Sequence, residues 1–234
     1  MALRGRRRLF HNARHKKNRQ RKRKIFPMNL PEARRPLASR STRWAALISR
    51  AAVGAGLSAD GISILSLVFA AAGAAALLTL ATPWNLLAGA ACVQLRLLCN
   101  LIDGMVAIEG GRKSKVGVLY NEVPDRVADS LFIVVLGYGV GIPWLGWLGA
   151  LAAAVTAYIR VLGGTFGLAQ DFRGPLAKQH RMAVMTAGCL LGSAEFAWRG
   201  TLHAVEAAAW VIAIGALVTC LTRLRAIAQQ LKAR

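Results

Sequence analysis

The sequence predicts an all-α integral membrane protein with six transmembrane helices and an N-terminal amphipathic helix on the membrane surface. Of its 234 residues, 55% are hydrophobic, and the mean hydropathy is +0.42. The apolar residues stand in long blocks and do not alternate with polar ones. Each block approaches the roughly 20 residues that cross a bilayer as a helix. These observations argue against a soluble globular core.

The net charge of +21 would fit a nucleic-acid-binding protein, but its distribution argues otherwise. Residues 1–26 hold twelve Lys or Arg and no acid, and most other basic residues fall in short segments between apolar blocks. This pattern is typical of a membrane protein that keeps its basic loops in the cytoplasm, beside anionic lipids. We therefore expect membrane lipids as partners and no specific nucleic acid.

The chain divides into three predicted parts: a basic tail (1–27), a juxtamembrane segment (28–56) and a membrane domain (57–234). The composition of the tail predicts disorder. The sequence leaves open whether this tail binds nucleic acid, binds lipid headgroups, or precedes a natural start at Met28. Within the second part, residues 37–56 carry large apolar side chains among arginines, which predicts a short amphipathic helix on the membrane surface.

The membrane domain is expected to contain six spans, at approximately 60–81, 84–107, 116–141, 144–169, 180–198 and 204–226. Pro83 and Pro143 mark two of the tight connections between them. Lys and Arg gather in the loops 108–115 and 170–181 and in the C-terminal tail. By the positive-inside rule, these loops and both termini lie on the cytoplasmic side of a multi-pass inner (cell) membrane protein.

Acidic residues are concentrated at the second and third spans. Five of the ten in the chain fall between positions 103 and 129, and these are Asp103, Glu109, Glu122, Asp125 and Asp129. An ionised Asp at the centre of a span costs roughly 2.5–3.5 kcal/mol, so several unpaired carboxylates would cost on the order of 10 kcal/mol. A bound divalent cation is an economical way to offset that cost. Ligands that are all oxygen favour Mg²⁺, Mn²⁺ or Ca²⁺ over zinc.

Helical spacing places these polar residues on two stripes. Asn100, Asp103 and Ala107 share one face of the second span, and Gly117, Asn121, Asp125 and Asp129 follow each other at intervals of four on the third. The loop between the spans is about eight residues long. We therefore expect the two helices to be antiparallel neighbours whose polar stripes face each other, with small residues leaving room for a ligand.

An ion-paired helix interface without any ligand is the alternative interpretation. Arg96 and Arg126 lie in the same two spans, and we expect Arg96 to pair with Asp129, the deepest acid of the third span. Two arginines do not neutralise the whole acidic set, so the sequence favours a metal site.

The segment from Asn100 to Asp125 resembles the signature of the CDP-alcohol phosphatidyltransferases. That signature reads D-x-x-D-G-x-x-A-R, eight residues, then G-x-x-x-D-x-x-x-D. The positions that match in register are Asp103, Gly104, Ala107, Gly117 and Asp125. The stretch 57–63 also resembles the opening of the first span in that family. This second likeness implies that Asp60 and Ser63 help to line the nucleotide site.

Three signature positions differ: Asn100 and Asn121 replace Asp, and Ile108 replaces Arg. In the family, four aspartates hold two divalent ions, and the last one is also the base for the acceptor hydroxyl. The resemblance therefore implies one or two Mg²⁺ or Mn²⁺ ions held by Asn100, Asp103, Asn121 and Asp125, with Asp125 catalytic. The two asparagines remove two negative charges, which puts the second ion in doubt unless Glu122 or Asp129 contributes.

The activity implied by the resemblance belongs to phospholipid biosynthesis. A phosphatidyl group passes from CDP-diacylglycerol or another CDP-alcohol to an alcohol acceptor, CMP is released, and the active site is cytoplasmic. Homodimers are usual in that family. The residues expected to bind nucleotide or substrate are Asp60, Ser63, Gly104, Ala107, Arg112, Gly117, Arg160, Lys178 and Arg181. Arg160 lies inside a span and needs an anionic partner there, unless it reaches the interface or pairs with Asp171.

Two other functions compete with the enzyme. The first is a catalytically degenerate relative that binds CDP-lipid or nucleotide without turnover, which the asparagines favour. The second is a small transporter, but the sequence shows no internal repeat of the kind common in transporters. The acceptor stays open between glycerol phosphate, inositol phosphate, serine and an amino alcohol, and the basic residues favour a phosphorylated one.

Overall fold

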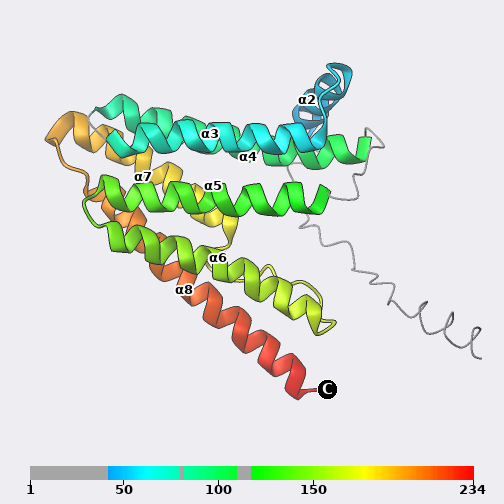
Figure 1. Ribbon diagram of the computed structural model, residues 1–234. Coiled ribbons are helices and arrows are strands. Elements are labelled where there is room, and N and C mark those ends of the chain that lie inside the picture. The colour runs from blue at the N-terminus through cyan, green and yellow to red at the C-terminus, as the bar shows by residue number, and fades with distance from the viewer. Residues whose placement is uncertain (1–41, 80–81, 110–116) are drawn as a thin grey trace, which may run out of the picture. The chain divides into compact units, whose positions relative to one another are not determined.

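The computed structural model describes residues 42–79, 82–109 and 117–234, and within these ranges all regular structure is helical. Figure 1 shows the arrangement of the helices. The first helix is the short α2 (Arg43–Gly54), which lies in the segment where an amphipathic helix is predicted. Six long helices follow: α3 (Ala59–Thr79), α4 (Pro83–Glu109), α5 (Gly117–Gly139), α6 (Pro143–Thr165), α7 (Lys178–Arg199) and α8 (His203–Lys232).

Four of the described helices, α3, α4, α6 and α8, are long and apolar enough to cross a membrane. The prediction of a helical membrane protein is therefore confirmed. The basic tail 1–27 and Arg112 lie outside the described residues.

Local sequence explains several helix boundaries. Pro83 and Pro143 are the first residues of α4 and α6, where proline gives up no helical hydrogen bond. Gly200 ends α7 in the left-handed conformation, with φ of 68°. The last helix continues to Lys232, beyond the predicted end at 226, and Ile227 in this extension is buried.

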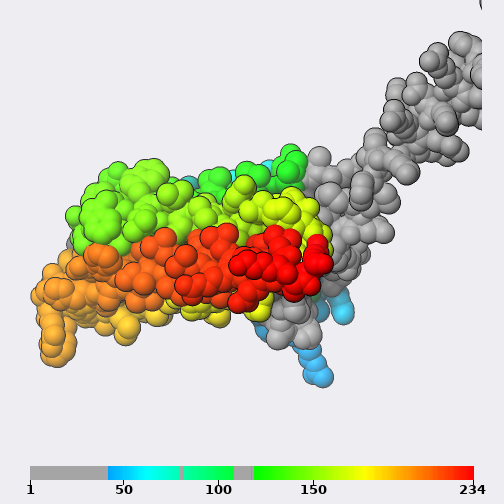
Figure 2. Space-filling model, turned by 90° about the horizontal axis from the view of Figure 1, so that it is seen from below, coloured from blue at the N-terminus to red at the C-terminus, as the bar shows by residue number. Residues whose placement is uncertain are grey.

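The helices pack in a defined order. α3 packs against α4 and α5, α4 against α7, α5 against α6, and both α6 and α7 against α8. Figure 2 shows α8, in orange to red, lying beside α6. α4 and α5 make little direct backbone contact. Their polar stripes nevertheless face each other as predicted, because Arg96 and Asn100 of α4 both donate to Asp125 Oδ1 of α5.

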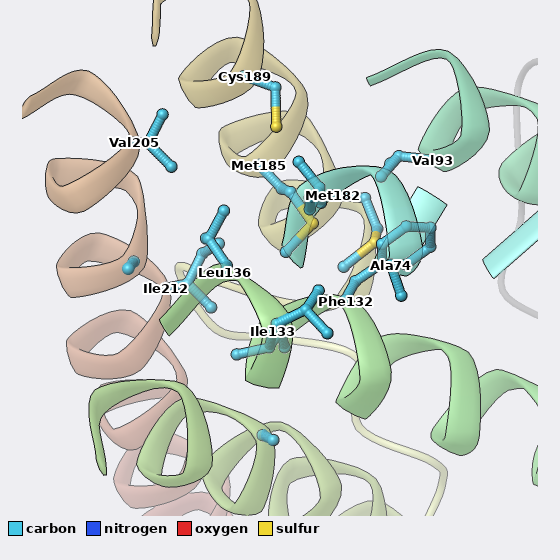
Figure 3. Packing of buried hydrophobic residues seen from close by; sticks show 14 of the residues in the cluster. Ala74, Val93, Phe132, Ile133, Leu136, Met182, Met185, Cys189, Val205 and Ile212 are labelled. Atoms are coloured by element: carbon cyan, nitrogen blue, oxygen red, sulfur yellow. The ribbon is translucent and has the colours of Figure 1, made fainter. Parts of the chain in front are cut away.

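The main apolar core lies at one end of the site-forming helices. Figure 3 shows Phe132 from α5, Met182 and Met185 from α7, and Ile212 from α8 packed together. These core residues follow the polar residues along α5 and α7, whereas on α4 the core residue Val93 precedes them. Consequently, the polar residues of all three helices gather at the end where α4 finishes and where α5 and α7 begin.

Candidate functional site

Asp125 is the residue on which three helices converge. Its Oδ1 accepts hydrogen bonds from Arg96 Nη2 at 3.0 Å and from Asn100 Nδ2 at 2.5 Å, both on α4. Its Oδ2 contacts Lys178 Nζ, at the first residue of α7, and lies 3.6 Å from Arg126 Nη2. Asp125 is only 7% exposed. A single buried carboxylate is therefore contacted by three cationic side chains and one amide.

Asp129, one turn further along α5, completes a continuous ion-pair network. Its Oδ1 lies 2.8 Å from Arg96 Nη2, and its Oδ2 accepts a hydrogen bond from Arg181 Nη2 at 3.3 Å. Arg96 and Asp129, which the sequence pairs, are thus in contact, but Arg96 also bridges to Asp125. Arg96 and Arg181 are buried, and neither Arg96 Nε and Nη1 nor Arg181 Nε has an acceptor among the described residues. The network therefore holds unused hydrogen-bond donors.

Asp103 is linked to α3. Its Oδ2 accepts a hydrogen bond of 2.6 Å from Ser63 Oγ, and the residue is 4% exposed. Asn100, one turn before Asp103 on α4, donates to Asp125, so the two signature aspartates border one site. Asp60 lies in the first turn of α3 and is half-buried. The stretch that opens α3 therefore reaches the signature residues of α4.

The remaining signature residues border this polar cluster. Asn121 is exposed near the start of α5, one turn before Asp125, while Gly104, Ala107 and Gly117 are half-buried. In the part of the chain that the structure describes, no group of three or more His, Cys, Asp or Glu side chains is placed to hold a metal. A metal site here therefore needs amide oxygens as well. Two carboxylates and two amides form an all-oxygen set that suits Mg²⁺ or Mn²⁺.

Arg160 has a protein partner that the sequence analysis did not predict. Its Nη2 donates to both carboxylate oxygens of Glu122 at 2.7 Å, its Nη1 donates to Gln170 Oε1 at 2.8 Å, and its guanidinium lies 5.4 Å from the ring centroid of Phe172. The alternative pairing with Asp171 is therefore not the one that the structure shows, and Arg160 does not require an anionic ligand. Arg160 and Glu122 are 38 positions apart, so no local sequence pattern reveals that they pair.

Asp171 instead pairs with Arg173 in the segment that precedes α7. Arg173 Nε lies 3.0 Å from Asp171 Oδ1. Burial by itself would raise the pKa of Asp171, but hydrogen bonds from the Arg173 side chain and backbone bring it below its ordinary value. Arg223 of α8 donates to Arg173 O at 2.9 Å and to Thr156 O at 2.7 Å. These contacts fix the segment that delivers Lys178 to the site.

Two cationic residues of α7 make ion pairs that the sequence did not reveal. Lys178 and Arg181 were expected to bind phosphate, whereas the structure pairs them with Asp125 and Asp129. The two cations are three residues apart on α7, and the two aspartates are four apart on α5, so each pair shares one face of its helix. This matching of spacings was the signal present in the sequence. Four cationic side chains, and not two arginines alone, therefore neutralise these acids. The case for a metal rests on the oxygen ligands and on the resemblance.

Known proteins resemble the chain over most of its length. No family profile matches it. A phosphatidylinositol phosphate synthase of Mycolicibacterium smegmatis is 27% identical over 190 residues, covering 77% of this chain and 82% of the relative. The protein of the same name from Mycobacterium tuberculosis is 26% identical over 192 residues, covering 77% of this chain and 83% of that protein.

Solved structures share the fold. A crystal structure of Mycobacterium tuberculosis phosphatidylinositol phosphate synthase with CDP-DAG bound has a TM-score of 0.66 at 24% identity, covering 80% of this chain and 94% of that one. A structure of that enzyme in complex with manganese and citrate has a TM-score of 0.65 at 24% identity and covers 78% and 88% of the two chains. The helical arrangement described above is thus that of these enzymes.

Proposed function

Because the chain belongs to the CDP-alcohol phosphatidyltransferase family, we propose that it transfers a phosphatidyl group from CDP-diacylglycerol to an alcohol and releases CMP. The observation that carries this proposal is that the buried Asp125 of α5 contacts both Lys178 of α7 and Asn100, which lies one turn from Asp103 on α4. The similarity to the two synthases supports it, because the matched region spans more than four-fifths of the length of each. The cofactor is Mg²⁺ or Mn²⁺.

The metal ligands we propose are Asn100, Asp103, Asn121 and Asp125. When bound there, a divalent cation supplies positive charge that stabilises the pyrophosphate and the departing CMP. Ser63 supports this role because its hydrogen bond fixes one oxygen of the Asp103 carboxylate. Metal ligands are commonly oriented by such outer hydrogen bonds.

Asp125 is the proposed general base. The acceptor oxygen attacks the phosphatidyl phosphorus, the bond from that phosphorus to the CMP oxygen breaks, and the hydroxyl proton passes to the Asp125 carboxylate. Arg96 and Asn100 hold Oδ1, which leaves Oδ2 for the proton once Lys178 moves aside. Lys178 is then free to bind an incoming phosphate, because its long side chain is flexible.

Phosphorylated acceptors come first among the candidates. The relatives are named phosphatidylinositol phosphate synthases, so inositol phosphate is the acceptor we propose. Arg126, whose Nε has no acceptor among the described residues, and Lys178 are the proposed phosphate-binding residues. Asp60, Gly104, Ala107 and Gly117 border the site and are proposed to accommodate the nucleotide.

We also propose the complete membrane topology. α5 and α7 cross the bilayer with the four more apolar helices, giving six spans, because the ion pairs above neutralise their charges. The polar ends of α4, α5 and α7, the site and both termini then face the cytoplasm, and α2 lies on the membrane surface. A homodimer is the proposed assembly.

The test is CMP release from CDP-diacylglycerol by the full-length protein in lipid nanodiscs, with Mn²⁺ or Mg²⁺ and a panel of alcohols. We expect metal-dependent CMP release that requires inositol phosphate. A different required alcohol would correct the acceptor alone. No release with any alcohol, together with binding of CDP-diacylglycerol, would favour the degenerate relative, for which the neutralised state of Asp125 is the supporting observation.

A further inference from the structure

We propose that this site holds one divalent cation and not two, and that Asn100 and Lys178 replace the second ion with protein groups. The inference rests on the proposed function, since it concerns the metal of that same site. Its evidence is the set of contacts made by Asp125, Asp129 and Glu122, the three acidic residues of α5.

The first step is the contact between Asn100 and Asp125. Two aspartates at these positions would repel each other and would need a cation between them. Here the Asn100 amide donates directly to Asp125 Oδ1 at 2.5 Å. A carboxylate can only accept, so the amide must present its NH₂ group to it and turn its oxygen elsewhere. The hydrogen bond thus joins α4 to α5 without a metal.

The second step is the ammonium group of Lys178. It contacts Asp125 Oδ2, the other oxygen of the same carboxylate. Both oxygens of Asp125 therefore already have cationic or NH donors within the protein, from Arg96, Asn100 and Lys178. Once Lys178 has moved aside for one ion at Asp125, a second dication at the same carboxylate would be repelled by that ion and by Lys178.

The third step is that the other two acids of α5 are also paired. Glu122 is bound through both oxygens by Arg160, and Asp129 is paired with Arg96 and Arg181. Neither acid is free to restore the charge lost at Asn100 and Asn121. Asp103, which accepts a hydrogen bond from the neutral Ser63, is the carboxylate that a single ion can share with Asp125 once Lys178 moves aside.

The charges agree with one ion. Replacing two aspartates by asparagines removes two negative charges, and omitting one dication removes two positive charges. The net charge of an Asn-containing site with one ion therefore equals that of a four-aspartate site with two ions.

The experiment counts Mn²⁺ bound to the purified full-length protein in nanodiscs, by metal analysis and by electron paramagnetic resonance. We expect one Mn²⁺ per wild-type chain and no spin-coupled pair signal. Lys178→Met should tighten Mn²⁺ binding about tenfold, because a nearby like charge is removed. Lys232→Met, at the exposed end of α8, is the matched control and should leave the affinity unchanged. The triple variant N100D/N121D/K178M should bind two coupled ions.

Two coupled ions in the wild-type chain, or no bound Mn²⁺, would overturn the inference, and this holds even if the triple variant does not fold. CMP release measured on the same samples separates the two proposals. One ion without CMP release would refute the proposed activity alone. Two ions with CMP release would refute the single-ion inference alone.

Discussion

The Arg160 guanidinium donates to both carboxylate oxygens of Glu122, at 2.7 Å each, and thereby joins α6 to the first turns of α5. The side chain of Arg160 is 10% exposed and that of Glu122 is 36% exposed, so water screens the pair only in part. Both bonds come from Nη2, and hydrogen bonds between charged groups are stronger than those between neutral groups. This pair therefore positions α5 beside α6 at the level of the site.

A double-mutant cycle measures how much this ion pair contributes to the stability of the protein. We expect Arg160→Gln and Glu122→Gln each to destabilise the protein, and the double variant to lose less than the sum, with a coupling of roughly 1 kcal/mol. Thermal unfolding in detergent measures it. If the two losses simply add, Arg160 is not held by Glu122, and its role in binding substrate returns.

Arg96→Leu should prevent stable folding. Arg96 is fully buried and touches both Asp125 and Asp129, so its removal leaves buried carboxylates short of a partner. Breaking a buried pair from one side costs roughly 3–5 kcal/mol. The measurement is the yield of monodisperse protein after detergent extraction. Arg43→Leu, on α2 away from this network, is the control, and full yield of the Arg96 variant would contradict the network.

Asp125→Asn should abolish turnover while keeping the fold. Alanine is less suitable here, because it would leave Arg96 and Lys178 without their acceptor. Asparagine keeps an acceptor oxygen but cannot take the proton, and loss of a general base typically costs 10²–10⁴-fold, a range we take as an order-of-magnitude guide. CMP release and thermal unfolding are measured together. A variant that retains near wild-type turnover would show that another group accepts the proton.

Much of the fold was predictable because its signals are local. Apolar blocks of spanning length predicted the helices, and Pro83 and Pro143 fixed two helix starts within a residue or two. The packing of α3 against α5 was not predictable from the short connections. It joins two helices that are separated in the chain by α4.

The site was predictable to the extent that its residues share a helix. Spacing alone placed Asn100 with Asp103, and Asp125 with Asp129. It could not show that Lys178 contacts Asp125 or that Arg160 binds Glu122, because these pairs join residues 53 and 38 positions apart. Composition counted the cations, but only the fold decides which acid each of them neutralises.

Ser63→Ala should weaken metal binding by about tenfold, because outer hydrogen bonds to ligands typically contribute 10–100-fold. Ser63 donates to Asp103 Oδ2 at 2.6 Å. Ser66→Ala is the matched control: its hydroxyl is equally buried but donates only to Ser63 O within α3. Titration of Mn²⁺ followed by paramagnetic resonance gives both affinities. Equal affinities in the two variants would mean that Asp103 does not depend on Ser63, or does not bind the ion.

The contact between α5 and α6 gives the last prediction. A Cβ on Gly146 would lie 2.6 Å from Val134 O and 3.0 Å from Ile133 O, both backbone atoms of α5 that cannot swing away. Gly146→Ala should therefore force the two helices apart and destabilise the protein by roughly 1–3 kcal/mol. Gly164→Ala is the control on the same helix, because its Cβ would meet nothing within 4 Å. Thermal unfolding measures the stability of both variants. If Gly146→Ala is as stable as Gly164→Ala, then α5 and α6 do not approach this closely in the membrane.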